Sequence, residues 1–143
     1  LKPFFDDTNK GVFVLCRTSN EGAGELQDLM VDGEPLYKRV AHLVSEKWNT
    51  NSNCGVVVGA TYPDELRQVR TIVGDMPILI PGVGAQGGEV EEAVLAGKDN
   101  RGKGIIVTAS RSIIFASKGP DFADAARAKA ETFLNRIKKA MVG

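Results

Sequence analysis

The chain has 143 residues, a formal net charge of zero and a pI of about 6.8. This length suits one domain with a single core, and the balanced charge predicts neither a nucleic-acid-binding nor a membrane-binding surface. The sequence holds no apolar run of membrane-spanning length and no signal-peptide pattern.

The two cysteines, Cys16 and Cys54, lack the spacing of metal ligands. We therefore expect two reduced, buried thiols in a cytoplasmic protein. The sequence begins at Leu1 rather than at a methionine, inside what reads as a continuing element, and this predicts a fragment of a longer protein.

Apolar runs and helical periodicity alternate along the chain. Continuous apolar runs without polar alternation are typical of strands buried on both faces of a parallel sheet. The predicted strands are residues 12–16, 55–59, 77–80 and 104–108. The predicted helices are residues 25–30, 35–48, 61–73, 89–96 and 121–141, with a short apolar turn at 112–116.

Three details of these helices are specific enough to test. Thr61 is the expected N-cap of the helix that contains Pro63, and Gly97 is the expected C-terminal cap of residues 89–96. The last helix is predicted to bury one apolar stripe. That stripe consists of Phe122, Ala126, Ala130, Phe133, Ile137 and Met141.

Four β-then-α units in succession predict a parallel sheet in a single domain, residues 1–143. Two architectures fit: an open doubly wound sheet, or part of an eight-stranded (βα) barrel. A complete barrel takes about 250 residues, so this chain would hold only half of one.

The stretch of residues 80–89, Ile-Pro-Gly-Val-Gly-Ala-Gln-Gly-Gly-Glu, dominates the functional prediction. Its glycines allow the backbone N–H groups to approach an anion closely, and a predicted helix follows. Gln86 is its one long polar side chain. Taken alone, the stretch fits a mobile turn equally well.

The next strand exit makes an anion site the better interpretation. Ser110 and Arg111 follow residues 104–108, and the exits of the last two strands often bind phosphate in barrels. A guanidinium would there join the backbone donors, although an ordinary surface arginine is the alternative for Arg111. Ser19, at the first strand exit, could bind a ligand or cap a turn, and Arg17 is expected to be structural.

Four segments together resemble orotidine 5′-phosphate decarboxylase over essentially the whole chain. They are Val-Leu-Cys-Arg-Thr-Ser-Asn at 14–20, Val-Val-Gly-Ala-Thr at 57–61, Ile-Pro-Gly-Val-Gly-Ala-Gln-Gly-Gly at 80–88, and Ser-Arg at 110–111. Two departures lie outside the proposed contacts: Glu21 stands where proline is common, and Glu89 where aspartate is common.

This resemblance implies a (βα)8 TIM barrel that works as a homodimer and without a cofactor or metal, converting orotidine 5′-phosphate to UMP and CO2. It implies that Ser19 binds the pyrimidine ring and that Gln86 bridges towards ring and phosphate. Arg111 would hold the phosphate, with backbone help from Ser110 and from Pro81, Gly82 and Val83.

The family's catalytic motif, Asp-x-Lys-x-x-Asp, does not occur in this sequence. In the family it lies on an early strand, so the resemblance assigns this chain to the C-terminal half of the barrel, strands five to eight, with no catalytic residue. The N-terminal half would be its partner. The alternatives are a non-catalytic phosphate-binding half-barrel and another phosphate-binding barrel enzyme, such as a phosphosugar isomerase or epimerase.

Overall fold

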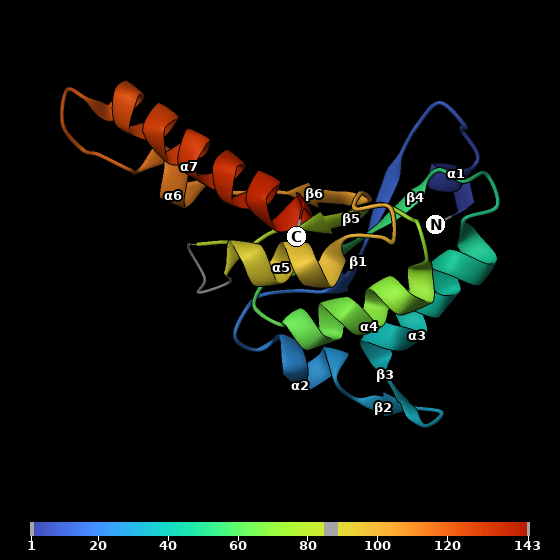
Figure 1. Ribbon diagram of the computed structural model, residues 1–143. Helices are drawn as coiled ribbons and strands as arrows, with labels where there is room; N and C mark the ends of the chain where they lie inside the picture. The colour runs from blue at the N-terminus through green and yellow to red at the C-terminus, as the bar shows by residue number, and fades with distance from the viewer. Residues whose placement is uncertain (1, 85–88, 143) are drawn as a thin grey trace.

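A four-stranded parallel sheet forms the centre of the computed structural model, which describes residues 2–84 and 89–142 (Figure 1). The strands are β1 (Val12–Arg17), β4 (Cys54–Val58), β5 (Ile78–Ile80) and β6 (Ile105–Val107), adjacent in that order. Every neighbouring pair is parallel. The four strands predicted from the sequence are therefore confirmed, each within a residue or two of its expected ends.

Helices follow the strands along the chain. Short helices are α1 (Lys2–Phe5), α2 (Ala23–Gln27) and α6 (Arg111–Ile114). The longer ones are α3 (Leu36–His42), which continues as the π-helical segment η1 (Leu43–Trp48), α4 (Pro63–Val73), α5 (Val90–Gly97) and α7 (Phe122–Val142). Helices α3, α4 and α5 lie along one side of the sheet, and α6 and α7 lie towards and beyond its β6 edge (Figure 1). Within the described residues, no helix is long and apolar enough to cross a membrane.

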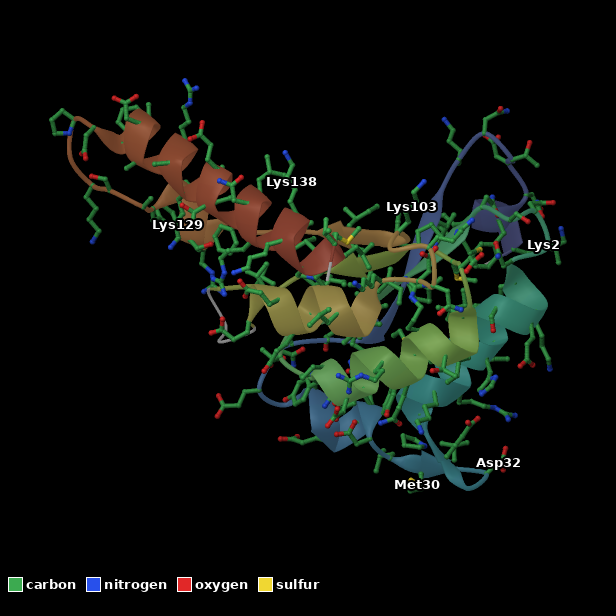
Figure 2. All side chains as sticks on the ribbon, viewed as in Figure 1. Lys2, Met30, Asp32, Lys103, Lys129 and Lys138 are labelled. Carbon is green, nitrogen blue, oxygen red and sulfur yellow. The ribbon has the colours of Figure 1, made fainter. Side chains whose placement is uncertain are left out.

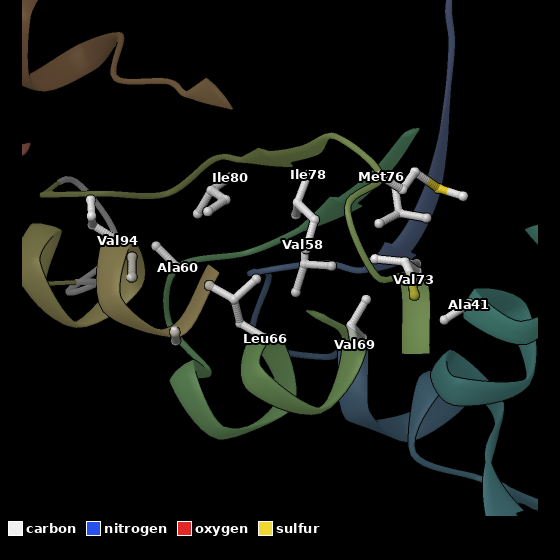
Figure 3. Packing of buried hydrophobic residues seen from close by; sticks show 14 of the residues in the cluster. Ala41, Val58, Ala60, Leu66, Val69, Val73, Met76, Ile78, Ile80 and Val94 are labelled. Carbon is white, nitrogen blue, oxygen red and sulfur yellow. The ribbon is translucent and has the colours of Figure 1, made fainter. Parts of the chain in front are cut away.

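The core lies between the sheet and these helices (Figure 3). Val58, Ile78 and Ile80 point from the strands towards Leu66 and other side chains of α4 and α5, and all four are fully buried. Alternate strand residues must point to the opposite face. Only one face of the sheet is thus covered by described helices.

The opposite face of the sheet is apolar, and it is exposed at the two outer strands. Leu15, Val57, Leu79 and Ile106 form one row across all four strands. Leu15 is 66% exposed and Ile106 is 47% exposed. A large exposed apolar surface of this kind is typical of an interface with another segment or chain rather than of a solvent-facing surface.

Two of the sequence predictions about helix caps are wrong, and so are the bounds predicted for the helix at residues 25–30. The N-cap of α4 is Tyr62, not Thr61, and its side chain makes no capping hydrogen bond. Gly97 is the last residue of α5 rather than its cap. A Cβ at Gly97 would lie 2.7 Å from Cδ1 of Ile80, so this glycine allows the helix to approach the sheet.

The helix predicted at residues 25–30 starts earlier and ends at Gln27. Met30 belongs instead to an antiparallel hairpin of β2 (Met30–Val31) and β3 (Glu34–Pro35). Its turn, Asp32-Gly33, has positive φ at both residues, as a two-residue hairpin turn of the primed type requires. Figure 2 shows Met30 and Asp32 on this hairpin, at the side of the molecule away from α7.

Only the C-terminal half of α7 buries the predicted stripe. Phe133 is buried, and Ile137 and Met141 pack against the core. Phe122, by contrast, is 61% exposed. The N-terminal half of α7 extends with α6 beyond the sheet (Figure 1). The apolar periodicity of the sequence therefore continues into a part of the helix that does not pack against the sheet.

Arg70 joins the N-terminal ends of β5 and β6 to the C-terminal ends of α4 and α5. Its guanidinium donates to the carbonyl oxygens of Gly97, Met76 and Gly104, each at 2.7 Å, and to that of Gly74. Burial lowers the pKa of Arg70, opposed by the nearby carboxylates of Asp99 and Asp75. One buried cation thus donates to four carbonyl oxygens at the ends of helices and strands, and buried polar groups of this kind need such partners.

Replacing Arg70 by methionine is expected to lower the free energy of unfolding by about 3 kcal/mol or more, because several buried acceptors lose a charged donor at once. Urea denaturation followed by circular dichroism measures the change. The control is Arg67→Met on the same helix, whose side chain is 60% exposed and pairs with Asp64. Equal losses for both variants would contradict the role of Arg70.

Candidate functional site

The loops after β5 and β6 enclose a cleft of about 170 Å3 at the C-terminal ends of the strands. Its lining residues are Pro81, Gly82, Val83, Thr108, Ala109, Ser110 and Arg111. Five of the seven residues proposed from the sequence, Pro81, Gly82, Val83, Ser110 and Arg111, therefore meet in one place. In parallel α/β folds this end of the sheet is where ligands bind.

The segment after β5, residues 81–89, is called the glycine loop below. Its described part, residues 81–84, depends on two glycines for its backbone conformation. Gly82 has φ of 93° and Gly84 has φ of 77°, a region that residues with a Cβ rarely adopt. A Cβ at Gly84 would also lie 2.9 Å from the ring of Phe133 on α7. Between the two glycines, Val83 is buried and anchors the loop to the core.

Arg111 is the one charged side chain among the described residues that line this cleft. It is the first residue of α6, and Ser110 is the N-cap without a side-chain capping bond. Within residues 2–84 and 89–142, the Arg111 side chain makes no hydrogen bond or ion pair, and it is exposed. A guanidinium held at a cleft mouth with unused donors suits an anionic group.

Pro81 contributes an acceptor rather than a donor. Proline has no N–H group, so the backbone donors of the cleft must come from its neighbours. The Pro81 carbonyl oxygen accepts from the N–H of Ala60 at 2.9 Å and from Oγ of Ser19 at 3.4 Å. It thereby connects the exits of β1, β4 and β5.

Ser19 does not line the cleft but lies beside it, at the exit of β1. Its Oγ would be only 1.9 Å from a Cβ at Gly59, so the serine side chain occupies the space that this glycine leaves. Ser19 is half-buried and bonds across to Pro81. The hydroxyl therefore faces the other strand exits rather than capping a helix.

Gln86 lies outside the described residues, as do residues 85, 87 and 88. The expected role of this side chain stays a prediction from the sequence.

Arg17 is structural, as the sequence analysis expected. It is 1% exposed, and it pairs with Asp28 and stacks over Tyr62. Neither partner was identified from the sequence, because Asp28 and Tyr62 lie far along the chain. The lining residues Thr108 and Ala109 were also missed, since the sequence analysis treated Thr108 as part of the strand.

Cys16 is not a nucleophile despite its place near this end of β1. Burial raises the pKa of its thiol to about 12, and the thiol donates to the carbonyl oxygen of Tyr37 at 3.0 Å. Cys54 is also free and buried, as expected.

A second pocket, of about 500 Å3, lies at the opposite end of the sheet beside Phe5 and Trp48. These rings stack with their centroids 6.0 Å apart. This pocket adjoins the N-terminal ends of the strands, the end that stabilises such folds rather than binding their ligands.

An ion-pair cluster links helix α7 to the C-terminal end of the glycine loop and to the start of α5. Arg136 bonds Glu91 through Nε at 2.7 Å and Glu89 through Nη2 at 2.8 Å. The hydrogen bond from Arg136 lowers the pKa of Glu91 to about 2. Phe133, one turn earlier on α7, contacts the loop at Gly84, so one helix fixes both flanks.

Because the pKa of Glu91 falls from 4.5 to about 2, its stabilising effect should be complete above pH 4.5 and lost as the pH drops towards 2. We expect the melting temperature of wild type to exceed that of Glu91→Gln by a constant margin above pH 5. This margin should shrink below pH 4.5, and salt should reduce it.

The control for this titration is Glu92→Gln, an exposed neighbour on the same helix. A Glu91→Gln margin that stays unchanged down to pH 2 would contradict the assigned ion pair.

Residues 2–128 match the sequence pattern described as the orotidine 5′-phosphate decarboxylase / HUMPS family. A protein of Janthinobacterium sp. (strain Marseille) named orotidine 5′-phosphate decarboxylase is 54% identical over 127 residues, which are 89% of this chain and 47% of that protein.

Solved structures agree with the sequence relatives. The Leishmania donovani OMP decarboxylase superposes with a TM-score of 0.80 at 36% identity, over 96% of this chain and 52% of that one. The Leishmania donovani UMP synthase gives a TM-score of 0.81 at 40% identity, over 95% of this chain and 30% of that one. The chain thus spans about half the length of the decarboxylase relatives it matches.

Proposed function

The chain belongs to the orotidine 5′-phosphate decarboxylase / HUMPS family, and on this premise we propose that it is the substrate-binding half of a decarboxylase that converts orotidine 5′-phosphate to UMP. Its family is one of TIM barrels, and the chain forms a partial barrel with a parallel sheet. The observation that carries the proposal is the cleft in which Arg111 meets the backbone of residues 81–83 and 108–110.

The phosphate group would occupy this cleft. Arg111 supplies a full positive charge, while Gly82, Val83 and Ser110 can offer backbone N–H groups. Gln86 would reach the ligand from the same loop. A phosphate bound by a guanidinium and several amides is held in both position and orientation.

The pyrimidine ring would extend from the cleft towards Ser19. This hydroxyl lies next to the exits of β4 and β5 and can exchange its weak bond to Pro81 for one to the ring amide. The 3.4 Å length of that bond is long for a hydroxyl donor, so little is lost in the exchange.

The bond-breaking chemistry would come from the other half of the barrel. When CO2 departs, its bonding electron pair stays on the pyrimidine carbon, and a lysine of the Asp-x-Lys-x-x-Asp motif would protonate that carbon. The groups in this chain bind the substrate away from that carbon. Their binding energy contributes to the rate only when the catalytic groups are held against the bound ring.

The open apolar face supports the need for a second half. Leu15, Ile106 and Phe13 are exposed on it, and β1 and β6 each have an unpaired edge. We propose that the N-terminal half of the same barrel covers this face and pairs with both edges, so that this chain forms strands five to eight as one unit. Below, "the assembled enzyme" means this chain joined to that half.

Two further features are proposed from the resemblance. The assembled enzyme would be a homodimer, to be measured by sedimentation. It would work without a cofactor in the cytoplasm, and the two free, buried thiols agree with a reducing compartment.

The proposal is tested by the affinity of the assembled enzyme for three ligands: UMP, ribose 5-phosphate and uridine. UMP should bind more tightly than either fragment, because it fills both subsites. Ser19→Ala should weaken UMP about two- to tenfold, the effect of one hydrogen bond, and leave ribose 5-phosphate unchanged.

The matched control is Ser45→Ala on η1, remote from the cleft, where the hydroxyl bonds only within its own helix. Equal affinity for UMP and uridine would reject the phosphate subsite. A Ser19→Ala variant that weakens both phosphorylated ligands alike would reject the ring contact.

A further inference from the structure

Arg17 ends β1 and is buried below the loop that carries Ser19. Its side chain is 2% exposed, and its Nε lies 3.2 Å from Oδ1 of Asp28. Its Nη2 donates to Oδ2 of the same carboxylate at 3.2 Å. The guanidinium carbon lies 4.1 Å from the ring centre of Tyr62, the N-cap residue of α4. A buried guanidinium needs such partners, since an unpaired one would be costly.

These contacts extend to the backbone of Thr18, directly before Ser19. Nη1 of Arg17 donates to the Thr18 carbonyl oxygen at 3.1 Å and to Oε1 of Gln27 at 3.3 Å. Gln27 in turn accepts from the Thr18 N–H at 2.9 Å and donates to the Thr18 hydroxyl at 2.9 Å. Both polar backbone groups of Thr18 are therefore held from α2 and β1.

The strand side of the loop is fixed as well. The N–H of Gly59 donates to the Arg17 carbonyl oxygen at 2.8 Å. The register between β1 and β4 shifts between Leu15 and Arg17, so the residues that follow leave the regular ladder. Beyond this bond, the backbone of residue 18 is held by the side chains of Arg17 and Gln27.

We propose that Arg17, acting with Gln27, is a positioning residue that aims the Ser19 hydroxyl at the pyrimidine ring. The inference rests on the proposed function and deepens it: this pair determines how strongly the site prefers a nucleotide to a bare sugar phosphate. Arg17 itself does not touch the ligand, because its side chain is enclosed by Asp28, Tyr62 and Gln27.

The measurement is the ratio of dissociation constants for ribose 5-phosphate and UMP in the assembled enzyme. Gln27→Ala removes the hydrogen bonds of Gln27 to the N–H and to the hydroxyl of Thr18, and it does not remove a charged side chain. It should lower the ratio about two- to tenfold, as far as Ser19→Ala does, with ribose 5-phosphate binding unchanged. Gln27→Glu keeps the acceptor for the Thr18 N–H and a partner for Arg17, so it should restore most of the ratio.

A double-mutant cycle separates positioning from general stability. In the Ser19→Ala background, Gln27→Ala should lower the ratio no further, because the hydroxyl that it positions is gone. Arg17→Met should behave as Gln27→Ala does, and if it does not fold, the Gln27 variants decide alone.

An unchanged ratio in Gln27→Ala, or full additivity with Ser19→Ala, would overturn the inference while leaving the proposed function intact. A wild-type enzyme that binds ribose 5-phosphate as tightly as UMP would overturn both.

Discussion

Replacing Arg111 by alanine should weaken binding of UMP by roughly 30- to 700-fold, which corresponds to a loss of about 2–4 kcal/mol of charge-assisted binding. Among the described residues, Arg111 is the only charged side chain lining the cleft. Ribose 5-phosphate should lose as much affinity as UMP, because both ligands carry the same phosphate. Uridine, which has none, should bind as before.

Titration calorimetry on the assembled enzyme gives these constants, and steady-state kinetics should show the same loss as a higher KM for orotidine 5′-phosphate. Arg127→Ala is the matched control. It removes the same charge from an 80% exposed position on α7, where Arg127 pairs only with Glu131. If KM is unchanged in Arg111→Ala, the phosphate does not bind in this cleft.

The strands and the cleft could be predicted from the sequence because they depend on local patterns. Strands buried in a parallel sheet read as unbroken apolar runs, and Val56, Val57 and Val58 show this directly. The exits of parallel strands then lie at one edge, so Gly82 and Arg111 meet although they are far apart in sequence. The hairpin around Asp32-Gly33 carried an equally local signal, an Asp-Gly pair, which the sequence analysis did not use.

The remaining features depend on contacts between distant segments. Gly97 has the residue type of a cap, and only the position of Ile80 shows that it is there for close packing. Arg70 resembles a surface residue in the sequence, yet it is buried among carbonyl oxygens from other elements. The periodicity of α7 likewise cannot tell which half of the helix has a surface to pack against.

The chain alone should have no decarboxylase activity. Transition-state stabilisation must act where charge develops, at the carbon that loses CO2. The residues proposed as ligand contacts would bind the phosphate and one edge of the ring. The catalytic motif of the family does not occur in this sequence.

The open face predicts the physical behaviour of the chain alone. Exposed side chains such as Leu15 and Ile106, together with two unpaired strand edges, should make it associate with itself or with its other half. Adding that half should bury this face and yield a discrete complex in size-exclusion chromatography.

The most direct measurement is therefore decarboxylation of orotidine 5′-phosphate by the purified 143-residue chain, with and without a separately expressed N-terminal half that carries Asp-x-Lys-x-x-Asp. The remainder of the Janthinobacterium relative, 54% identical in the shared region, is a suitable source. We predict no turnover by either piece alone and turnover by the mixture, which Arg111→Ala should reduce. Turnover by the chain alone would contradict the account, and a stable complex that binds UMP without turnover would instead favour a non-catalytic phosphate-binding half-barrel.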